Sequence, residues 1–70
     1  MSGTIKVIVN GSPREVPAGS TVADLIRELG LSKAACAAEV NRALVPRREH
    51  PNRPLVEQDV VELVTLVGDG

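Results

Sequence analysis

The stretch Val60-Val61-Glu62-Leu63-Val64-Thr65-Leu66-Val67 decides the fold, because it is the strongest strand pattern in the chain. Aliphatic and β-branched residues fill it, and only Glu62 and Thr65 interrupt its apolar character. Strands that are apolar on both faces lie in the interior of a sheet. We therefore predict that these residues form a central strand that is covered on both sides.

A short glycine-containing segment, Gly68-Asp69-Gly70, follows this strand directly. Three extended residues reach about 10 Å, which is enough to enter a narrow pocket of another protein. Glycine passes where larger side chains clash. The alternative is a frayed terminus without a role. The pattern makes the carboxylate of Gly70 the candidate reactive group, presented by a tail of residues 68–70 that includes Gly68 and Asp69.

The composition limits the class of protein. Seventy residues form a single domain, residues 1–70, with a small core of Val, Leu, Ile and Ala. A net charge of −1 and the absence of aromatic residues argue against nucleic-acid binding. One cysteine excludes a disulfide framework and a multi-cysteine zinc site. No signal peptide or membrane span is evident. We expect a cytoplasmic chain that is a monomer when free and contacts no membrane.

The first half of the chain predicts a hairpin and a helix. Alternation over residues 5–9 indicates a strand, followed by a turn and a second strand from Arg14 to Pro17. An Asn10-Gly11 turn of type I′ would place Ile5 opposite Val16. A Gly11-Ser12 turn of type II′ would place Val7 opposite Val16, and we favour it because Pro13 then starts the strand.

The helix is the best-specified element of the chain. Thr21 is a favourable N-cap, and Asp24 occupies the acidic position of a capping box. Four residues then form one apolar stripe at helical spacing, and Gly30 is placed to end the helix in a Schellman motif, with Leu31 packing back. The stripe consists of Val22, Leu25, Ile26 and Leu29.

The second half of the chain is more ambiguous. Residues 33–41 suit a helix by alanine propensity and a strand by alternation, and we favour the strand. We predict that Leu44-Val45-Pro46 forms a short strand at the edge of the sheet, because of its proline. Residues 47–54 are predicted to form a polar surface loop, with Leu55 buried beneath it. The resulting order is β-β-α-β-β-β. An α+β, β-grasp (ubiquitin-like) fold follows, with a mixed sheet gripping one helix and the last strand parallel to the first.

These residues resemble the ThiS family, the sulfur-carrier proteins of thiamine biosynthesis, over essentially the full length. The resemblance rests on Asn10-Gly11, on the start of the helix, on the glycine-containing end and, most specifically, on Glu39-Val40-Asn41 followed by Leu44-Val45-Pro46-Arg47. It also favours the strand over residues 36–41.

The resemblance implies a chemistry carried out by partner proteins. An E1-like adenylyltransferase would use ATP to adenylate the Gly70 carboxylate. Sulfur from a cysteine desulfurase would displace AMP, and the resulting thiocarboxylate would supply thiazole synthase. The chain would be a protein co-substrate for thiazole synthesis, not an enzyme, and would bind no cofactor itself. The alternatives are a β-grasp regulatory module without tail activation and the related sulfur carrier of molybdopterin synthesis.

Two residues depart from the family pattern. Asp69 replaces the usual penultimate glycine, and its carboxylate lies about 6 Å from the terminal one, where repulsion is ~0.7 kcal/mol in water and ~3 kcal/mol in a partly desolvated pocket. This charge would slow activation. Gln58 stands where the family usually has glycine before Asp59, which suggests a different turn.

The remaining candidates each have a structural and a functional interpretation. Cys36 suits a small buried strand residue better than a reactive thiol. His50 has no second ligand nearby, so we expect no metal site. Arg47 either contacts an acidic partner or lies on a solvated loop. Three residues of the expected strands, Ile8, Val64 and Leu66, form either a docking patch or part of the core. The chain shows no catalytic constellation of its own.

Overall fold

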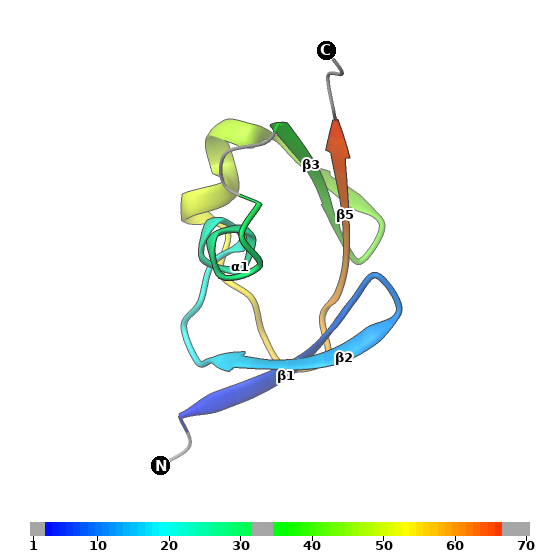
Figure 1. Ribbon diagram of the computed structural model, residues 1–70. Coiled ribbons are helices and arrows are strands. Elements are labelled where there is room, and N and C mark those ends of the chain that lie inside the picture. Colours follow the sequence, from blue (N-terminus) through cyan, green and yellow to red (C-terminus); the bar gives the residue numbers. More distant parts are fainter. Residues whose placement is uncertain (1–2, 32–34, 67–70) are drawn as a thin grey trace.

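The computed structural model describes residues 3–31 and 35–66, with only the backbone of Leu66 (Figure 1). The described residues form a five-stranded sheet in the order β2-β1-β5-β3-β4, with a helix packed on one face. The elements are β1 (Thr4–Val9), β2 (Ser12–Pro17), α1 (Val22–Glu28), β3 (Ala35–Val40), β4 (Ala43–Val45), the 3₁₀ helix η1 (Arg47–Asn52) and β5 (Val60–Leu66). This arrangement is the predicted β-grasp fold.

Strand β5 occupies the centre of the sheet, as predicted. It runs parallel to β1 and antiparallel to β3. The prediction that both of its faces are covered is wrong. The helix covers one face only, so Val60 and Val64 on the other face are 41% and 56% exposed. The face of the sheet opposite α1 is called the outer face below.

The two ends of α1 have the predicted caps. Thr21 Oγ1 accepts from the Asp24 N–H at 3.2 Å, and Asp24 Oδ2 accepts from the Thr21 N–H at 2.9 Å. The Thr21 backbone hydrogen bond lowers the pKa of Asp24 below its usual value, and an ion pair with Arg27 adds to this effect. At the other end, Gly30 has φ +76° and the Leu31 N–H reaches the Ile26 carbonyl at 3.0 Å, which completes the Schellman motif.

The core is entirely aliphatic and lies between α1 and the sheet. Its residues come from every strand, from α1 and from the segment before β5. The buried apolar side chains are Val7, Val9, Val16, Val22, Leu25, Ile26, Ala38, Val40, Val45, Leu55, Val61 and Leu63. Leu55 is buried as predicted. Because a domain of this size is only marginally stable, its polar contacts matter beside this core.

The first hairpin has the register that we did not favour. Ile5 lies opposite Val16, and Asn10 and Gly11 form the turn with φ of +50° and +86°. Two positive φ values are the mark of a type I′ turn. The preference for Gly11-Ser12 rested on the missing N–H of Pro13. That N–H would point away from β1 in the observed register, so the proline costs no hydrogen bond.

The segment Arg47 to Pro54 is not an irregular loop. Residues 47–52 form η1, and the imidazole of His50 is buried, with Nε2 donating to the Val45 carbonyl at 3.1 Å. This contact ties η1 to the edge strand β4. The strand prediction for residues 35–40 is confirmed, and Lys33 lies outside the described residues. No helix within residues 3–31 and 35–66 is long and apolar enough to cross a membrane.

Candidate functional site

The side chain of Asn10 fixes one edge of β5. Backbone pairing between β1 and β5 covers only Ile8 with Val60 and Val9 with Val61. Beyond that point, Asn10 Nδ2 donates to the Leu63 carbonyl at 3.2 Å, and Asn10 Oδ1 accepts from the Leu63 N–H at 2.8 Å. The carboxamide thus replaces one residue of a neighbouring strand and extends the ladder after β1 has turned away.

The side chain of Asn41 holds the start of β5 from the opposite side. Asn41 Oδ1 accepts from the Val60 N–H at 3.0 Å, and Asn41 Nδ2 donates to Asp59 Oδ1 at 3.0 Å. Asp59 is 4% exposed, and its other oxygen, Oδ2, accepts from the Val56 N–H at 2.9 Å. A buried carboxylate requires such partners. The entry into β5 is therefore fixed by a small polar network.

These contacts position the strand that leads to the predicted reactive tail. In Figure 1, β5 rises past the β1–β2 turn toward the end of the molecule that lies opposite the beginning of β1. Gly68, Asp69 and Gly70 follow β5 in sequence and lie outside the described residues. The described part of the chain thus supplies a rigid support for the segment on which the predicted chemistry depends.

A shallow groove on the outer face lies beside the C-terminal half of β5. Val64 lies opposite Ala37 of β3 in this groove, and Leu44 of β4 is 68% exposed. The other lining residues are Glu39, Glu62 and Arg42. Exposed apolar side chains gathered in one groove are typical of an interaction site.

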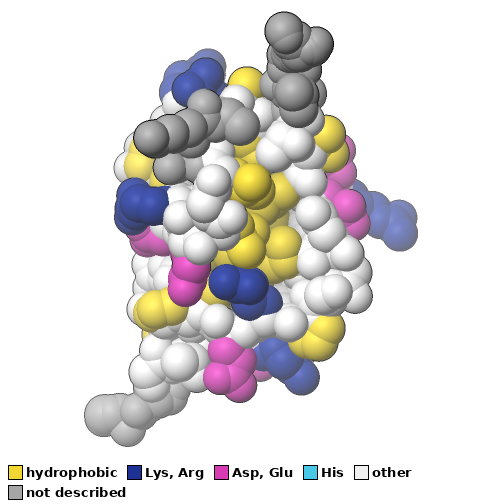
Figure 2. Space-filling view, viewed as in Figure 1, with side chains coloured by type: hydrophobic (Ala, Val, Ile, Leu, Met, Phe, Trp, Pro, Cys, Tyr) yellow, Lys and Arg dark blue, Asp and Glu magenta, His cyan; other side chains and the backbone are white. Residues whose placement is uncertain are grey.

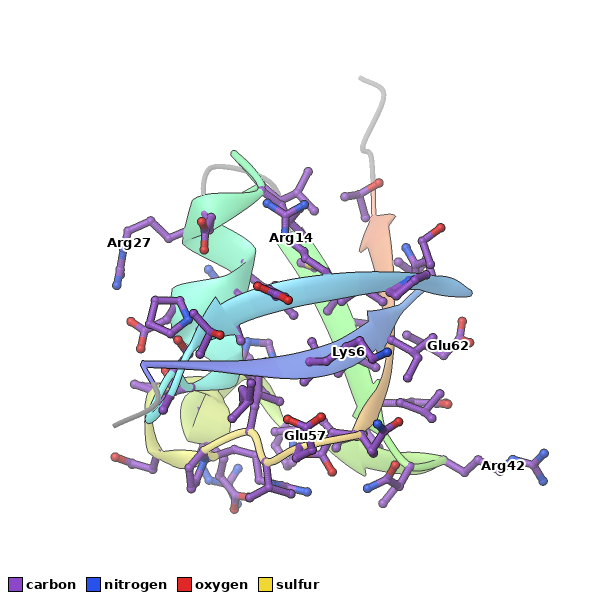
Figure 3. All side chains as sticks on the ribbon, turned by 90° about the horizontal axis from the view of Figure 1, so that it is seen from below. Lys6, Arg14, Arg27, Arg42, Glu57 and Glu62 are labelled. Atoms are coloured by element: carbon purple, nitrogen blue, oxygen red, sulfur yellow. The ribbon has the colours of Figure 1, made fainter. Side chains whose placement is uncertain are left out.

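The groove also contains closely spaced charges. Glu39 and Glu62 are cross-strand neighbours, and neither forms an ion pair within the described residues. Like charges directly opposite each other destabilise a sheet. Arg42 of the β3–β4 turn lines the same groove, and Figure 3 shows its side chain extending from the body on the side opposite Arg27. The groove therefore offers a partner both apolar contacts and unpaired charges.

The structure brings together some of the predicted docking residues. Val64 lies in the groove, and Ile8 lies half-buried on the outer face, opposite Val60. The side chain of Leu66 lies outside the described residues. Arg47 is exposed and lines two hollows, one with Cys36 and His50 and one that shares Ala37 and Leu44 with the groove. Among the predicted docking residues whose side chains are described, Val64 lies in the groove, Ile8 on the same face, and Arg47 in an adjoining hollow.

Sequence reasoning missed the charged and β4 residues of the groove. The alternation of side chains along a strand could have identified Leu44 as an outer-face residue. Val45 is buried, so the side chain of its neighbour Leu44 must point to the opposite face. The pairing of Glu39 with Glu62 depends on the register between β3 and β5, which no local pattern specifies.

Cys36 lies on β3 and packs against the core, half-buried. Burial raises the pKa of its thiol, which favours the neutral form over the nucleophilic thiolate. Within the described ranges, no group of three or more His, Cys, Asp or Glu side chains is arranged to hold a metal ion.

A model of the ThiS family matches residues 7–70. This chain belongs to the ThiS family. The ThiS family comprises sulfur carriers of thiamine biosynthesis, and the relatives agree with this assignment. The sulfur carrier protein ThiS of Thermus thermophilus is 36% identical over 64 residues, which cover 91% of this chain and 98% of that protein. The thiamine biosynthesis protein ThiS of Geobacter metallireducens superposes with a TM-score of 0.75 at 25% identity, covering 94% of this chain and 100% of that structure.

Two longer relatives carry another name. The thiazole synthase of Magnetococcus marinus is 35% identical over 66 residues, and that of Paramagnetospirillum magneticum is 32% identical over 66 residues. This ThiS-family chain spans 20% of the length of each of them. In both, a segment similar to ThiS is therefore part of a chain named for the synthase.

Proposed function

We propose that this protein is a sulfur carrier whose Gly70 carboxylate becomes a thiocarboxylate and donates sulfur for thiazole synthesis. Membership of the ThiS family over residues 7–70 supports the proposal most strongly. The two asparagine side chains that hold β5 support it physically, since a tail can be presented accurately only from a fixed strand.

The proposed chemistry converts an unreactive group in three steps. The carboxylate attacks the α-phosphorus of ATP on an E1-like adenylyltransferase, and pyrophosphate leaves. The terminal sulfur of a cysteine persulfide formed by a cysteine desulfurase then attacks the acyl carbon, and AMP leaves. A partner thiol attacks the other sulfur of the resulting acyl disulfide, so that the thiocarboxylate leaves and the two cysteine sulfurs form a disulfide. The chain contributes the carboxyl group and a docking surface. It is a co-substrate rather than an enzyme, and ATP is bound by the partner.

We assign the docking role to the outer-face groove. Its apolar centre, Val64 and Leu44, would be buried by the partner, and Glu39 and Glu62 would meet basic groups there. Such complementary charge accelerates association and fixes orientation. Ile8 extends this surface toward β1. Arg47 lines an adjoining hollow that shares Ala37 and Leu44 with the groove, so we place it at the margin of the docking surface.

Intact-mass measurement tests the proposed chemistry. The full chain is incubated with ATP, the E1-like adenylyltransferase, the desulfurase, cysteine and a thiol reductant. Replacement of one oxygen by sulfur at the carboxylate raises the mass by the difference between the two atoms, and deletion of Gly70 abolishes this gain. An unchanged mass for a chain that still binds its partners would instead indicate a regulatory module. Preferential binding to the large molybdopterin synthase subunit over thiazole synthase would indicate the molybdopterin pathway.

A matched pair of surface variants tests the docking surface. Val64→Ser removes an apolar side chain from the groove, and Val56→Ser removes one of equal exposure, 58% against 56%, outside it. We expect Val64→Ser to weaken binding to the adenylyltransferase about tenfold and Val56→Ser to have little effect. Equal affinities for the two variants, measured by calorimetry, would contradict this assignment.

A tail variant tests the role of Asp69. Removing this carboxylate lowers the repulsion that opposes approach of the terminal carboxylate to the phosphates of ATP. We expect Asp69→Gly to accelerate adenylation. Pyrophosphate exchange with the same adenylyltransferase measures the rate, and identical rates for the two forms would show that the charge is tolerated.

A further inference from the structure

One edge of β5 is left open within the described residues. Odd-numbered residues along this stretch direct their main-chain groups toward β1: the Asp59 carbonyl accepts from the Ile8 N–H and the Val61 carbonyl from the Asn10 N–H, both at 2.9 Å. The Asn10 side chain then occupies both main-chain groups of Leu63. Thr65 is next in this alternation, and β1 has already turned away. The N–H and C=O of Thr65 therefore point to a vacant edge, whereas β3 pairs along the other edge as far as Leu66.

The two outer edges of the sheet are protected against pairing, unlike this one. In β2, the observed register turns residues 13, 15 and 17 outward, and two of the three are Pro13 and Pro17, which have no N–H to offer. Arg14 of the same strand points a charged side chain inward, another device that protects edge strands. The opposite edge, β4, has only three residues and is followed by Pro46. Residues 60–70 contain no proline.

A hollow lies on the α1 side of the sheet beside Asn10, whose side chain occupies the main-chain groups of Leu63. It is lined by Val9, Asn10, Pro13, Arg14 and Leu29, together with Ser12. Figure 2 shows hydrophobic side chains reaching the surface between α1 and β5 in this region. An added strand gains affinity from main-chain hydrogen bonds and specificity from a pocket for alternate side chains, and this edge offers both.

We propose that a strand of thiazole synthase pairs with the open edge of β5 at Thr65 and continues the sheet there. This inference rests on the proposed sulfur-carrier function. Thiazole synthase is the occupant that the relatives favour, because two chains of that name contain a segment similar to this one. The tail follows β5 in sequence, so pairing at Thr65 would fix the strand that precedes the segment carrying Gly70.

Three variants test the proposal in the full-length protein. Thr65→Pro removes the N–H at the open edge without removing a bond to β3, since the even-numbered residues face β3. Thr65→Val keeps that N–H, and Glu15→Pro removes the equivalent outward N–H from β2. We expect Thr65→Pro to weaken binding to thiazole synthase about tenfold or more, and the other two to stay within about twofold of the parent. Equal loss for Thr65→Pro and Glu15→Pro would overturn the proposal.

Amide hydrogen exchange provides a second measurement that needs no substitution. In the free protein we expect the Thr65 amide to exchange rapidly and the Val64 amide, which faces β3, to exchange slowly. In the saturated complex with thiazole synthase, the Thr65 amide becomes protected at least about tenfold. A Thr65 amide that remains unprotected in a stable complex would overturn the edge proposal and leave the carrier function intact. Failure to bind thiazole synthase at all would overturn both.

Discussion

The two hairpin turns of this protein share a backbone shape but differ at one residue. Both are two-residue turns with positive φ at each position, +50° and +86° at Asn10-Gly11 and +53° and +71° at Asn41-Arg42. Both begin with an asparagine whose side chain reaches across to β5. Asparagine tolerates the left-handed conformation better than most residues, so one residue type serves the turn and the strand.

The second position separates the two turns. Gly11 adopts its conformation at no steric cost, and a Cβ there would meet no atom within 4 Å, so the positive φ alone favours glycine. Arg42 adopts the same region with a full side chain, at a cost of about 1 kcal/mol or more. Arg42, which adopts this unfavourable conformation, lines the outer-face groove together with Glu39 and Glu62. If the groove has the docking role proposed above, the first turn serves stability and the second also serves recognition.

Breaking the Asn41 contacts should have the largest effect. Asn41→Ala leaves the Val60 N–H without its acceptor and removes one partner from the buried carboxylate of Asp59. We expect a loss of about 2–3 kcal/mol in the free energy of unfolding, a large part of the stability of a domain this small. Urea titration followed by circular dichroism measures it. A loss below that of Asn10→Ala would reverse the ranking of the two turns.

Breaking the Asn10 contacts should have a somewhat smaller effect. Asn10→Ala leaves both main-chain groups of Leu63 without a partner and places alanine at positive φ, for an expected loss of about 2 kcal/mol. Asn10→Gly keeps the backbone freedom and removes only the hydrogen bonds. The difference between these two variants separates the conformational cost from the contacts with β5, and equal losses would show that the contacts account for all of it.

Replacing Arg42, the second residue of the β3–β4 turn, by glycine makes this turn like the Asn10-Gly11 turn and tests the comparison of the two turns directly. Arg42→Gly relieves the left-handed conformation, and glycine's greater freedom in the unfolded chain offsets part of the gain, so we expect stability to rise by about 0.5–1 kcal/mol. Partner binding should weaken at the same time, because the cation beside the two glutamates is lost. A variant that is more stable and binds equally well would remove the case for recognition by Arg42.

Gln58 provides a control for Arg42, because its replacement by glycine should change stability but not partner binding. It has φ +73° in the turn before β5 and lies outside the outer-face groove. Gln58→Gly should therefore raise stability by about 0.5–1 kcal/mol as well, without a change in partner affinity. Thermal unfolding and binding measurements on the same sample check both halves. Weakened binding by this variant would show that the effect of Arg42→Gly is not specific to the groove.

The sequence predicted the structure correctly wherever the interactions that determine it are between residues close together in the chain. The caps of α1 depend on Thr21, Asp24 and Gly30, all within a few residues of the helix ends, and each is where the pattern places it. The central position of β5 also followed from its composition. The composition did not reveal that α1 covers only one face, because a run of valines appears the same whether its second face is buried by the chain itself or left exposed.

The errors arose where a distant residue decides the local structure. The turn at Asn10-Gly11 is stabilised by Leu63, which lies 53 residues further along the chain, so comparison of turn types alone selected the wrong register. His50 is buried, and its Nε2 donates a hydrogen bond to the Val45 carbonyl, a contact that the proline-rich polar segment around it does not reveal. The docking groove likewise depends on the register of three strands.

The central position of β5 has a consequence for synthesis of the protein. Strand β5 lies between β1 and β3 in the sheet and is the last of the five strands to be synthesised. Until β5 has left the ribosome, the β2-β1 pair and the β3-β4 pair cannot join into one sheet. Pairing β1 with β5 also closes most of the chain into one loop, which makes this step slow. A nascent chain cut short before β5 lacks both the fold and the tail. Incomplete products therefore cannot form the sheet or the part of the outer-face groove that β5 supplies.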